Sequence, residues 1–256
     1  MKIFVTNLKT SVDRRKSIET QFQRLGLEYE FFDCVVGADL SEEYLEQTCD
    51  MAKIARYNEK VVWFTRGIIG CTMTNQNICR EIVARNLDYA LLLEDDILIT
   101  PDLEKVLQNI EPKIQQGDVI LLFYMSWAPL QLKREKDGAI YKDYALHQPV
   151  DSGKITGGSA MIVTRKAAER MVRQNTPIHT TPDDWGYYLK GGSIDRLLCV
   201  YPYCIDTADF KSTMKTSRFN FLSDIVDKYR IPIFSQLLKW KRKKEKRQKQ
   251  QITIVD

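Results

Sequence analysis

The apolar residues of this chain fall into short runs and into helical spacings, and the two alternate along most of its length. Short apolar runs bounded by polar or turn residues are typical of buried strands. Six such runs are predicted to be strands: 3–8, 29–36, 89–93, 118–124, 160–163 and 197–200. Between them, spacings such as Ile18, Phe22 and Leu25 at i, i+4 and i+7 predict helices. This alternation predicts an α/β fold with a mostly parallel sheet flanked by helices.

The pattern changes twice along the chain. Residues 127–153 are polar and irregular, and we expect a loop or a small hairpin over a site. Near residue 225 the alternation gives way to an apolar stripe and then to Lys239–Gln250, which holds eight Lys or Arg residues and one Glu. We therefore predict a folded domain at 1–224 and an amphipathic, basic C-terminal segment at 225–256.

The positive charge of the chain is concentrated in that C-terminal segment. The formal net charge is +4, to which Lys239–Gln250 contribute +7, leaving −3 for the rest. A nucleic-acid-binding domain would spread its charge over a folded face, so nucleic acid is not expected as a partner. An apolar stripe beside basic residues favours an anionic membrane surface, at about 1 kcal/mol per basic residue near it. The alternative is a solubilising tail in water.

Two observations bear on the compartment. The start of the chain, Met1–Val5, has no apolar region typical of a signal peptide, and no stretch reaches the roughly 18 apolar residues of a membrane-spanning helix. The six cysteines form no C-x-x-C pair, and with only two histidines a zinc site is not expected. We therefore expect reduced thiols, with a disulfide framework as the weaker alternative, in a protein that stays in the cytosol or lies against a membrane from that side.

The strand predicted at 89–93 runs directly into three acids, Glu94, Asp95 and Asp96. Adjacent carboxylates repel one another, and at the end of a buried strand their charge is costly unless a positive group lies among them. A hard divalent cation takes oxygen ligands from one or two carboxylates and keeps water and phosphate in the rest of its shell. The run therefore indicates a metal–diphosphate site, with an acidic loop in water as the alternative.

Other polar residues are predicted at the same edge of the sheet, where open α/β sheets bind their ligands. Asn7 and Leu8 follow the first strand, and Asp33 lies near the end of the second. Arg14, in the first turn of the next helix, would reach a phosphate, whereas Asn7 and Asp33 suit a base or a ribose hydroxyl. The chain has no G-x-G-x-x-G and no P-loop lysine, so neither the usual dinucleotide fold nor a P-loop is supported.

Residues 182–185, Pro-Asp-Asp-Trp, form a second candidate cluster at a predicted helix start. Asp183 or Asp184 would take the proton from an attacking sugar hydroxyl, while the indole of Trp185 packs on a sugar ring. The alternative is ordinary helix capping, which favours Asp in a first turn. Gly158, in a Gly-Gly-Ser run, allows a ligand to approach the backbone closely, with a tight turn as the equal alternative.

Taken together, these residues resemble a known family. Five motifs carry the resemblance: Asn7-Leu8 with Asp13-Arg14-Arg15, Tyr29–Asp33 with Gly37, Gly70-Cys71, Leu92–Asp96, and Gly158-Ser159-Ala160 with Thr164–Glu169. In order and spacing they are similar to glycosyltransferase family 25, the lipooligosaccharide and lipopolysaccharide glycosyltransferases of Gram-negative bacteria, with the collagen galactosyltransferases as relatives. The resemblance covers residues 1–215.

The resemblance implies a GT-A-type, Rossmann-like fold and transfer of a hexose, galactose or glucose, from a UDP-sugar to a lipooligosaccharide or lipopolysaccharide acceptor with inversion. It also implies Mn²⁺ or Mg²⁺. The basic C-terminal segment adds the expectation of a peripheral place on the inner face of the bacterial inner membrane. Asp96 and Glu94 would hold the cation, and Asp184 or Asp183 would be the base. The donor would be bound by a larger set: Asn7, Leu8, Arg14, Asp33, Glu94, Asp95 and Gly158.

One departure from the family pattern keeps an alternative open. The family commonly has G-C-x-x-S-H where this chain has Gly-Cys-Thr-Met-Thr-Asn at 70–75, so Asn75 stands in place of a histidine. A relative that binds a UDP-sugar or a glycan without turnover therefore remains possible. A nucleotidyltransferase is a further alternative, but it would need a Gly-rich loop after the first strand, and residues 7–15 contain no glycine.

Overall fold

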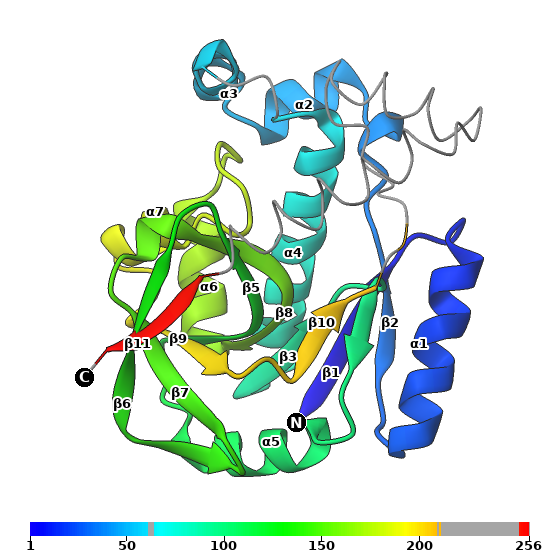
Figure 1. The fold of residues 1–256 in the computed structure, drawn as a ribbon. Coiled ribbons are helices and arrows are strands. Elements are labelled where there is room, and N and C mark those ends of the chain that lie inside the picture. Colours follow the sequence, from blue (N-terminus) through cyan, green and yellow to red (C-terminus); the bar gives the residue numbers. More distant parts are fainter. Residues whose placement is uncertain (61–63, 209, 211–250, 256) are drawn as a thin grey trace, which may run out of the picture.

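One large sheet organises the fold (Figure 1). The computed structural model describes residues 1–60, 64–208, 210 and 251–255. In the described part, nine strands lie in the order β11-β6-β7-β9-β5-β8-β3-β1-β2. Their bounds are β1 Lys2–Asn7, β2 Glu30–Asp33, β3 Tyr89–Leu93, β5 Asp118–Ser126, β6 Leu130–Tyr141, β7 Tyr144–Pro149, β8 Ile155–Thr164, β9 Arg196–Tyr201 and β11 Ile252–Val255. A separate antiparallel pair joins β4 (Ile97–Ile99) to β10 (Ile205–Thr207).

The sheet combines parallel and antiparallel pairs. β1 runs parallel to β2 and to β3, β5 runs parallel to β9, and β6 runs parallel to β11. β8 runs antiparallel to its neighbours β3 and β5, and β7 runs antiparallel to β6 and β9. As a result, the first residues of β8 lie at the edge of the sheet where β3 ends. The predicted α/β class, with a large sheet flanked by helices, is confirmed.

Helices cover both faces of the sheet. α1 (Val12–Leu25) and α5 (Leu103–Ile110) contribute to the core on one face. α4 (Arg66–Ala84), α6 (Arg165–Gln174) and α7 (Trp185–Lys190) contribute to the core on the other. α2 (Glu42–Thr48) and α3 (Met51–Lys60) pack with the first half of α4 in a smaller cluster beyond the edge of the sheet (Figure 1). Within the described residues, short 3₁₀ helices lie at Gly37–Asp39, Glu111–Lys113 and Ser152–Lys154.

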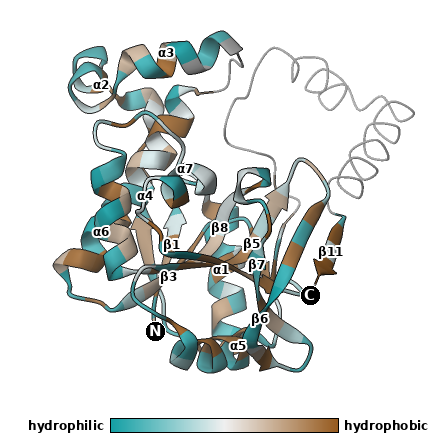
Figure 2. Cartoon of the chain, turned by 90° about the vertical axis from the view of Figure 1, so that its left-hand side faces the viewer, coloured by the Kyte–Doolittle hydropathy of each residue, from teal (hydrophilic) through white to brown (hydrophobic). Residues whose placement is uncertain are grey.

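The position of β3 explains its unbroken apolar sequence. Leu91 and Leu93 pack into the core on one face of the sheet and Leu92 into the core on the other, all almost completely buried. Burial of one leucine side chain stabilises a fold by about 1.5–3 kcal/mol relative to leaving it exposed. Figure 2 shows the hydrophobic strands in the middle of the molecule between more hydrophilic helices. The three acids that follow β3 are therefore held at a firmly anchored strand end.

Two glycines allow α4 to approach the segment after β2. A Cβ on Gly70 would lie 2.6 Å from the carbonyl oxygen of Val35, and a Cβ on Gly37 would lie 1.8 Å from that of Arg66. No other residue avoids these overlaps, because only glycine lacks a Cβ. The close packing holds the next residue of α4, Cys71, near the acids that follow β3.

The segment at 127–153 is a hairpin. β6 and β7 pair with each other, and β7 pairs with β9. Of the two predicted forms, the hairpin is therefore the one observed. It extends the sheet on the side away from β1.

The end of the chain returns to the sheet. Ile252–Val255 form β11, with Ile252 opposite Leu130 of β6. The predicted apolar stripe and basic run, 231–250, lie outside the described residues. Of the predicted segment at 225–256, the part that the structure does describe therefore belongs to the sheet. Among the described helices, none is long and apolar enough to cross a membrane.

Candidate active site

The predicted site residues meet where β1 and β3 end and β8 begins. Asn7 ends β1, and the acids follow β3 directly. The register places Val5 beside Leu93, so Asn7 lies level with Asp95 on the neighbouring strand. Ser159, near the start of β8, accepts a hydrogen bond on its carbonyl oxygen from the Glu94 N–H at 2.8 Å. The site therefore lies at the carboxyl ends of the parallel strands, as predicted.

Asp95 is the best satisfied of the three acids. It is 7% exposed, and its Oδ2 accepts from Asn7 Nδ2 at 2.7 Å. Its Oδ1 accepts from Arg14 Nη1 at 2.9 Å. A buried carboxylate is tolerated when it is paired and hydrogen-bonded, and both of its oxygens have partners here. Asp95 therefore serves to hold Asn7 and Arg14 in place.

Asp96 is paired on one oxygen only. Its Oδ2 accepts from the same Arg14 Nη1 at 3.0 Å, whereas its Oδ1 is buried and has no hydrogen-bond partner among the residues that the structure describes. Burial raises the pKa of Asp96, and the Arg14 guanidinium opposes that rise. Buried polar atoms are nearly always satisfied, so an oxygen without a partner calls for a ligand that the protein does not supply.

Glu94 points toward β8. Its Oε2 accepts from the Ser159 hydroxyl at 2.9 Å. Burial, followed by the negative charge of Asp96, raises the pKa of Glu94 to about 7, and Asp183 and Asp95 add to the rise. A carboxylate in this state gains most from a nearby cation, because the cation favours its charged form.

The donor set fits a hard divalent cation that shares its shell with a ligand. Among the residues that the structure describes, no group of three or more His, Cys, Asp or Glu side chains is arranged to hold a metal ion. Asp96 and Glu94 would therefore supply one or two oxygens, and phosphate and water the rest, as Mg²⁺ sites commonly do. The partnerless Oδ1 of Asp96 is the atom that carries this fit.

The structure separates the two candidate bases. Asp184 is the N-cap of α7: its Oδ1 accepts from the Tyr187 N–H at 3.1 Å and its Oδ2 from the Thr180 hydroxyl at 2.8 Å. Asp183 faces β8, where its Oδ2 accepts from the Thr156 hydroxyl and from the Gly157 N–H at 2.8 Å. Its negative charge reaches Glu94, whose pKa it helps to raise. Asp183 is therefore the carboxylate that belongs to the site, whereas Asp184 has the alternative role of a cap.

Trp185 does not face a ligand. Its side chain is 0% exposed, and its Nε1 donates to the carbonyl oxygen of Gly157. The prediction that this indole packs on a sugar ring is wrong. The start of α7 leaves Asp183 partly exposed but directs the side chain of Trp185 into the core. Gly158 lies beside the candidate base, where a Cβ would be 3.8 Å from the Cβ of Asp183.

The remaining predicted residues lie around the rim. Asp33 is exposed, and its Oδ2 lies 3.0 Å from Lys9 Nζ. The Leu8 carbonyl accepts from the Ser11 N–H at 2.8 Å, which closes the turn into α1. Arg14 pairs with two of the acids, Asp95 and Asp96.

Beside Arg14 is a cavity of about 260 Å³, lined by residues 10–14 and Phe210. The ring of Phe210 lies 5.5 Å from the guanidinium carbon of Arg14. Nothing in the sequence pattern pointed to Phe210 or to Thr156. Ser159 lies within a quoted motif, but the motif did not show that its hydroxyl binds Glu94.

Asn75, where the family commonly has His, lies one turn of α4 after Cys71. Its Nδ2 donates to the Cys71 carbonyl oxygen at 3.2 Å. Burial raises the pKa of the Cys71 thiol, and the charges of Glu94 and Asp183 raise it further. The thiol therefore lies beside both carboxylates, and Asn75 lies next to the thiol.

The geometry agrees with a comparison with known families. The model of glycosyltransferase family 25 (LPS biosynthesis protein) matches residues 1–185. The chain belongs to glycosyltransferase family 25. Both the predicted family and the predicted class of enzyme, a glycosyltransferase, are thereby confirmed.

Proteins from animals and from a virus are similar in sequence to parts of this family 25 chain. A glycosyltransferase 25 family member of Drosophila melanogaster is 35% identical over 102 residues, which are 39% of this chain and 16% of that protein. Procollagen galactosyltransferase 1-A of Xenopus laevis is 28% identical over 127 residues, 47% of this chain and 21% of that protein. A putative glycosyltransferase of Acanthamoeba polyphaga mimivirus is 27% identical over 179 residues, which are 67% of this chain and 52% of that protein. The matches thus span a sixth to a half of these relatives.

Proposed function

We propose that this family 25 chain is a metal-dependent, inverting hexosyltransferase that moves galactose or glucose from a UDP-sugar to a lipooligosaccharide or lipopolysaccharide glycan. The observation that carries the proposal is the buried, partnerless Oδ1 of Asp96 beside Glu94, whose pKa is raised to about 7. Two neighbouring acids at the ligand-binding edge of an α/β sheet, one with an unsatisfied oxygen and one with a raised pKa, suit a cation that accompanies a diphosphate. The family supports transfer of a sugar.

In this proposal the acids at the end of β3 serve the leaving group. Asp96 and Glu94 would hold Mn²⁺ or Mg²⁺, which would supply positive charge for the departing UDP. Asn7 and Arg14 fix Asp95, and Arg14 also pairs with Asp96, so this side of the site is held rigid before a substrate binds. Preorganised charge of this kind is usually the largest contribution to catalysis.

Asp183 serves the acceptor. Its carboxylate takes the proton of the attacking hydroxyl while the new bond from the acceptor oxygen to the anomeric carbon forms and the bond to the diphosphate breaks. The Thr156 hydroxyl and the Gly157 N–H hold one of its oxygens. A single displacement of this kind inverts the anomeric carbon.

The test is hydrolysis and transfer from a panel of UDP-sugars with and without Mn²⁺. Wild-type protein is expected to release UDP from UDP-galactose or UDP-glucose only with the metal, and EDTA is expected to stop it. Asp96→Ala is expected to lose at least about a hundredfold in rate, the size of effect seen when one charge-stabilising group is removed. Turnover that persists in EDTA at the wild-type rate would refute metal dependence.

A second candidate is a binding protein without turnover. It is favoured by one observation: Arg14 already pairs with both Asp95 and Asp96, so the charge of these acids is partly compensated without a cation. This candidate predicts that UDP binds equally well with and without Mn²⁺ and that no UDP-sugar is consumed. Calorimetric titration with UDP, together with the panel above, separates the two.

The membrane part of the proposal rests on the composition of the C-terminal segment and on the family description. The basic run at 239–249 would hold the protein to the inner face of the bacterial inner membrane, near a glycolipid acceptor. Because Ile252–Val255 belong to the sheet, deletion of the whole segment would also remove β11. Replacement of the eight basic residues by Gln is the better test, with flotation on anionic vesicles as the measurement. Unchanged flotation would exclude this role.

A further inference from the structure

An exposed apolar strip lies at the end of β5, beside the candidate base. Met125 is 46% exposed and Trp127 is 59% exposed, whereas Tyr124 and Ser126 are buried. Met125 lies in β5 opposite Thr156 of β8, and Trp127 directly follows the end of β5. Tryptophan is highly buried on average, and exposed apolar patches mark binding surfaces. Neither residue has a part in the reaction described above.

The indole of Trp127 is held in place by its neighbours. Its Nε1 lies 3.4 Å from the carbonyl oxygen of Gly153 and donates to it. Gly153 in turn packs against the start of α7, where a Cβ on Gly186 would lie 3.4 Å from the Cα of Gly153. A ring fixed in this way loses little freedom when it binds a ligand.

The strip lies on the far side of Asp183 from the acids that follow β3. Along the segment that leads into β8, three contacts follow one another: Gly153 meets Trp127, Thr156 and Gly157 meet Asp183, and Ser159 meets Glu94. In the β5–β8 pair, Met125 lies directly opposite Thr156. At about 3.3 Å per residue, the four steps from the first residue of β8 to Ser159 span roughly 13 Å, enough for substrate groups on both sides of Asp183.

We propose that Trp127 and Met125 form the acceptor subsite and bind the apolar face of a neutral pyranose ring. The C–H face of the sugar stacks on the indole and its hydroxyls stay in water, with one hydroxyl directed to Asp183. The nearby Asp183 charge disfavours an anionic ring. This inference rests on the proposed function, since it assigns the donor to the Asp96 side and the acceptor to the Trp127 side.

The experiment compares Trp127→Ala, Trp127→Phe and a matched control, Tyr44→Ala. Tyr44 is an aromatic residue of α2 that is 47% exposed and lies in a different part of the molecule. The probes are lactose and methyl β-D-galactopyranoside, with saturating UDP-galactose and Mn²⁺. For each variant, the acceptor KM and the hydrolysis of donor in the absence of acceptor are measured. The indole N–H signal of Trp127 is followed by NMR while each saccharide is added.

The acceptor KM is expected to rise at least about fivefold in Trp127→Ala, the lower end of the cost of losing one stacked ring. It should recover in part in Trp127→Phe and stay unchanged in Tyr44→Ala, while donor hydrolysis stays unchanged in all three. An unchanged KM overturns the inference. A parallel fall in donor hydrolysis also overturns it, because Trp127 would then contact the donor, for example its uracil.

The NMR signal separates failure of this inference from failure of the proposed function. If wild-type protein neither hydrolyses nor transfers any donor, the proposed function fails, but saccharide binding at Trp127 still shifts its indole signal. A signal that does not move with either saccharide overturns the acceptor subsite whether or not the donor is consumed.

Discussion

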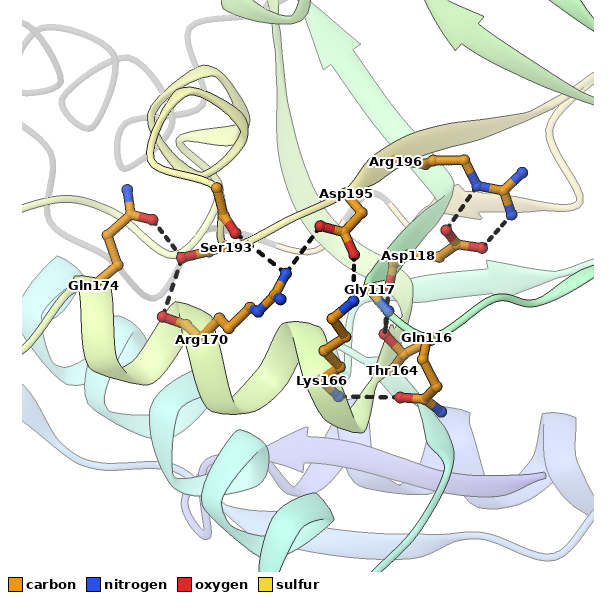
Figure 3. A network of polar contacts seen from close by, with 11 residues as sticks. Gln116, Gly117, Asp118, Thr164, Lys166, Arg170, Gln174, Ser193, Asp195 and Arg196 are labelled. Atoms are coloured by element: carbon orange, nitrogen blue, oxygen red, sulfur yellow. Dashed lines mark hydrogen bonds and ion pairs between the residues drawn. The ribbon is translucent and has the colours of Figure 1, made fainter.

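Two aspartates, Asp118 buried and Asp96 half-buried, pair with arginines at opposite edges of the same sheet, and they differ in how completely their oxygens are satisfied. Asp118, at the start of β5, accepts from Arg196 Nε at 2.8 Å on Oδ1 and from Arg196 Nη2 on Oδ2 at 2.6 Å (Figure 3). Its Oδ2 also accepts from the Gln115 N–H. Asp96, at the edge where β3 ends, shares Arg14 with another acid, and its buried Oδ1 has no partner in the described part of the chain.

The difference is the one expected between a structural ion pair and the proposed binding site. Around Asp118, the Thr164 hydroxyl donates to the Asp118 carbonyl and accepts from the Gly117 N–H, so the network closes on itself (Figure 3). Around Asp96 the network stays open, and Glu94 beside it has a raised pKa. A satisfied network contributes to the fold alone, whereas an unsatisfied one stores energy that a ligand releases.

The largest expected effect concerns the base. Asp183→Asn should lower the transfer rate by about 10²–10⁴-fold, because the amide cannot take a proton from the acceptor hydroxyl. Asp184→Asn is the matched control: Asn is as good an N-cap as Asp, so both the rate and α7 should be retained. Rates with saturating donor and acceptor decide between the two residues. Equal losses in both variants would contradict the assignment of the base.

Substitution in the satisfied network around Asp118 should lower stability and leave the transfer rate unchanged. Asp118→Ala leaves Arg196 without its partner and should lower the free energy of unfolding by about 3 kcal/mol, as expected when a buried pair is broken. The rate per folded molecule should not change. Asp195→Ala, which removes a surface partner of Lys166 and Arg170, should cost less than about 1 kcal/mol. Urea unfolding measures both. If Asp118→Ala instead abolished turnover of folded protein, the comparison between the two edges would fail.

A smaller effect is expected in the pH dependence of stability. The pKa of Glu94 is about 7 in the folded protein and 4.5 in an unfolded chain, so the folded state holds its proton more tightly. Stability from this group is complete below pH 4.5 and is lost as pH rises toward 7. Without metal, the difference in unfolding free energy between wild type and Glu94→Gln should fall by about 1–2 kcal/mol over that range. This is less than the full pKa shift corresponds to, because Glu94 is only partly shielded from water. Addition of Mn²⁺ should make this difference depend less on pH.

Glu30 provides a check on the sign. Hydrogen bonds from Arg85 and Lys2 lower the pKa of Glu30 to about 2. Its contribution to stability is present above pH 4.5 and lost only as pH falls toward 2, so it does not overlap with that of Glu94. A difference between wild type and Glu94→Gln that grows below pH 4.5 would contradict the attribution to Glu94.

The sequence predicted the strand end and its acids because both depend on local pattern. Leu91–Leu93 are apolar on both faces of a buried strand, and the next three residues can only lie at its end. The class of fold followed from the same alternation. The motifs of family 25 then identified the chemistry more sharply than any single residue did.

Contacts between segments that are far apart in the sequence could not be predicted from local pattern. Asn7 and Asp95 are 88 residues apart, and Ser159 and Glu94 are 65 apart, so no spacing rule connects them. Whether Asp183 or Asp184 faces the site depends on the hydrogen bonds of β8 to Asp183. The same helix start buries Trp185. The pairing of Ile252–Val255 with β6 was not predicted either, because these residues follow a basic run whose pattern is not typical of a strand.

The central claim is that the second oxygen of Asp96 coordinates a cation, whereas both oxygens of Asp118 are satisfied by hydrogen bonds within the protein. Calorimetric titration of Mn²⁺ into the UDP-saturated protein tests it most directly, with wild type, Asp96→Asn and Asp195→Ala compared. The account predicts one saturable site in wild type and in Asp195→Ala, and binding at least about tenfold weaker in Asp96→Asn, the loss of about 1.4 kcal/mol. Equal Mn²⁺ affinity in all three proteins, or no binding in wild type, would contradict it.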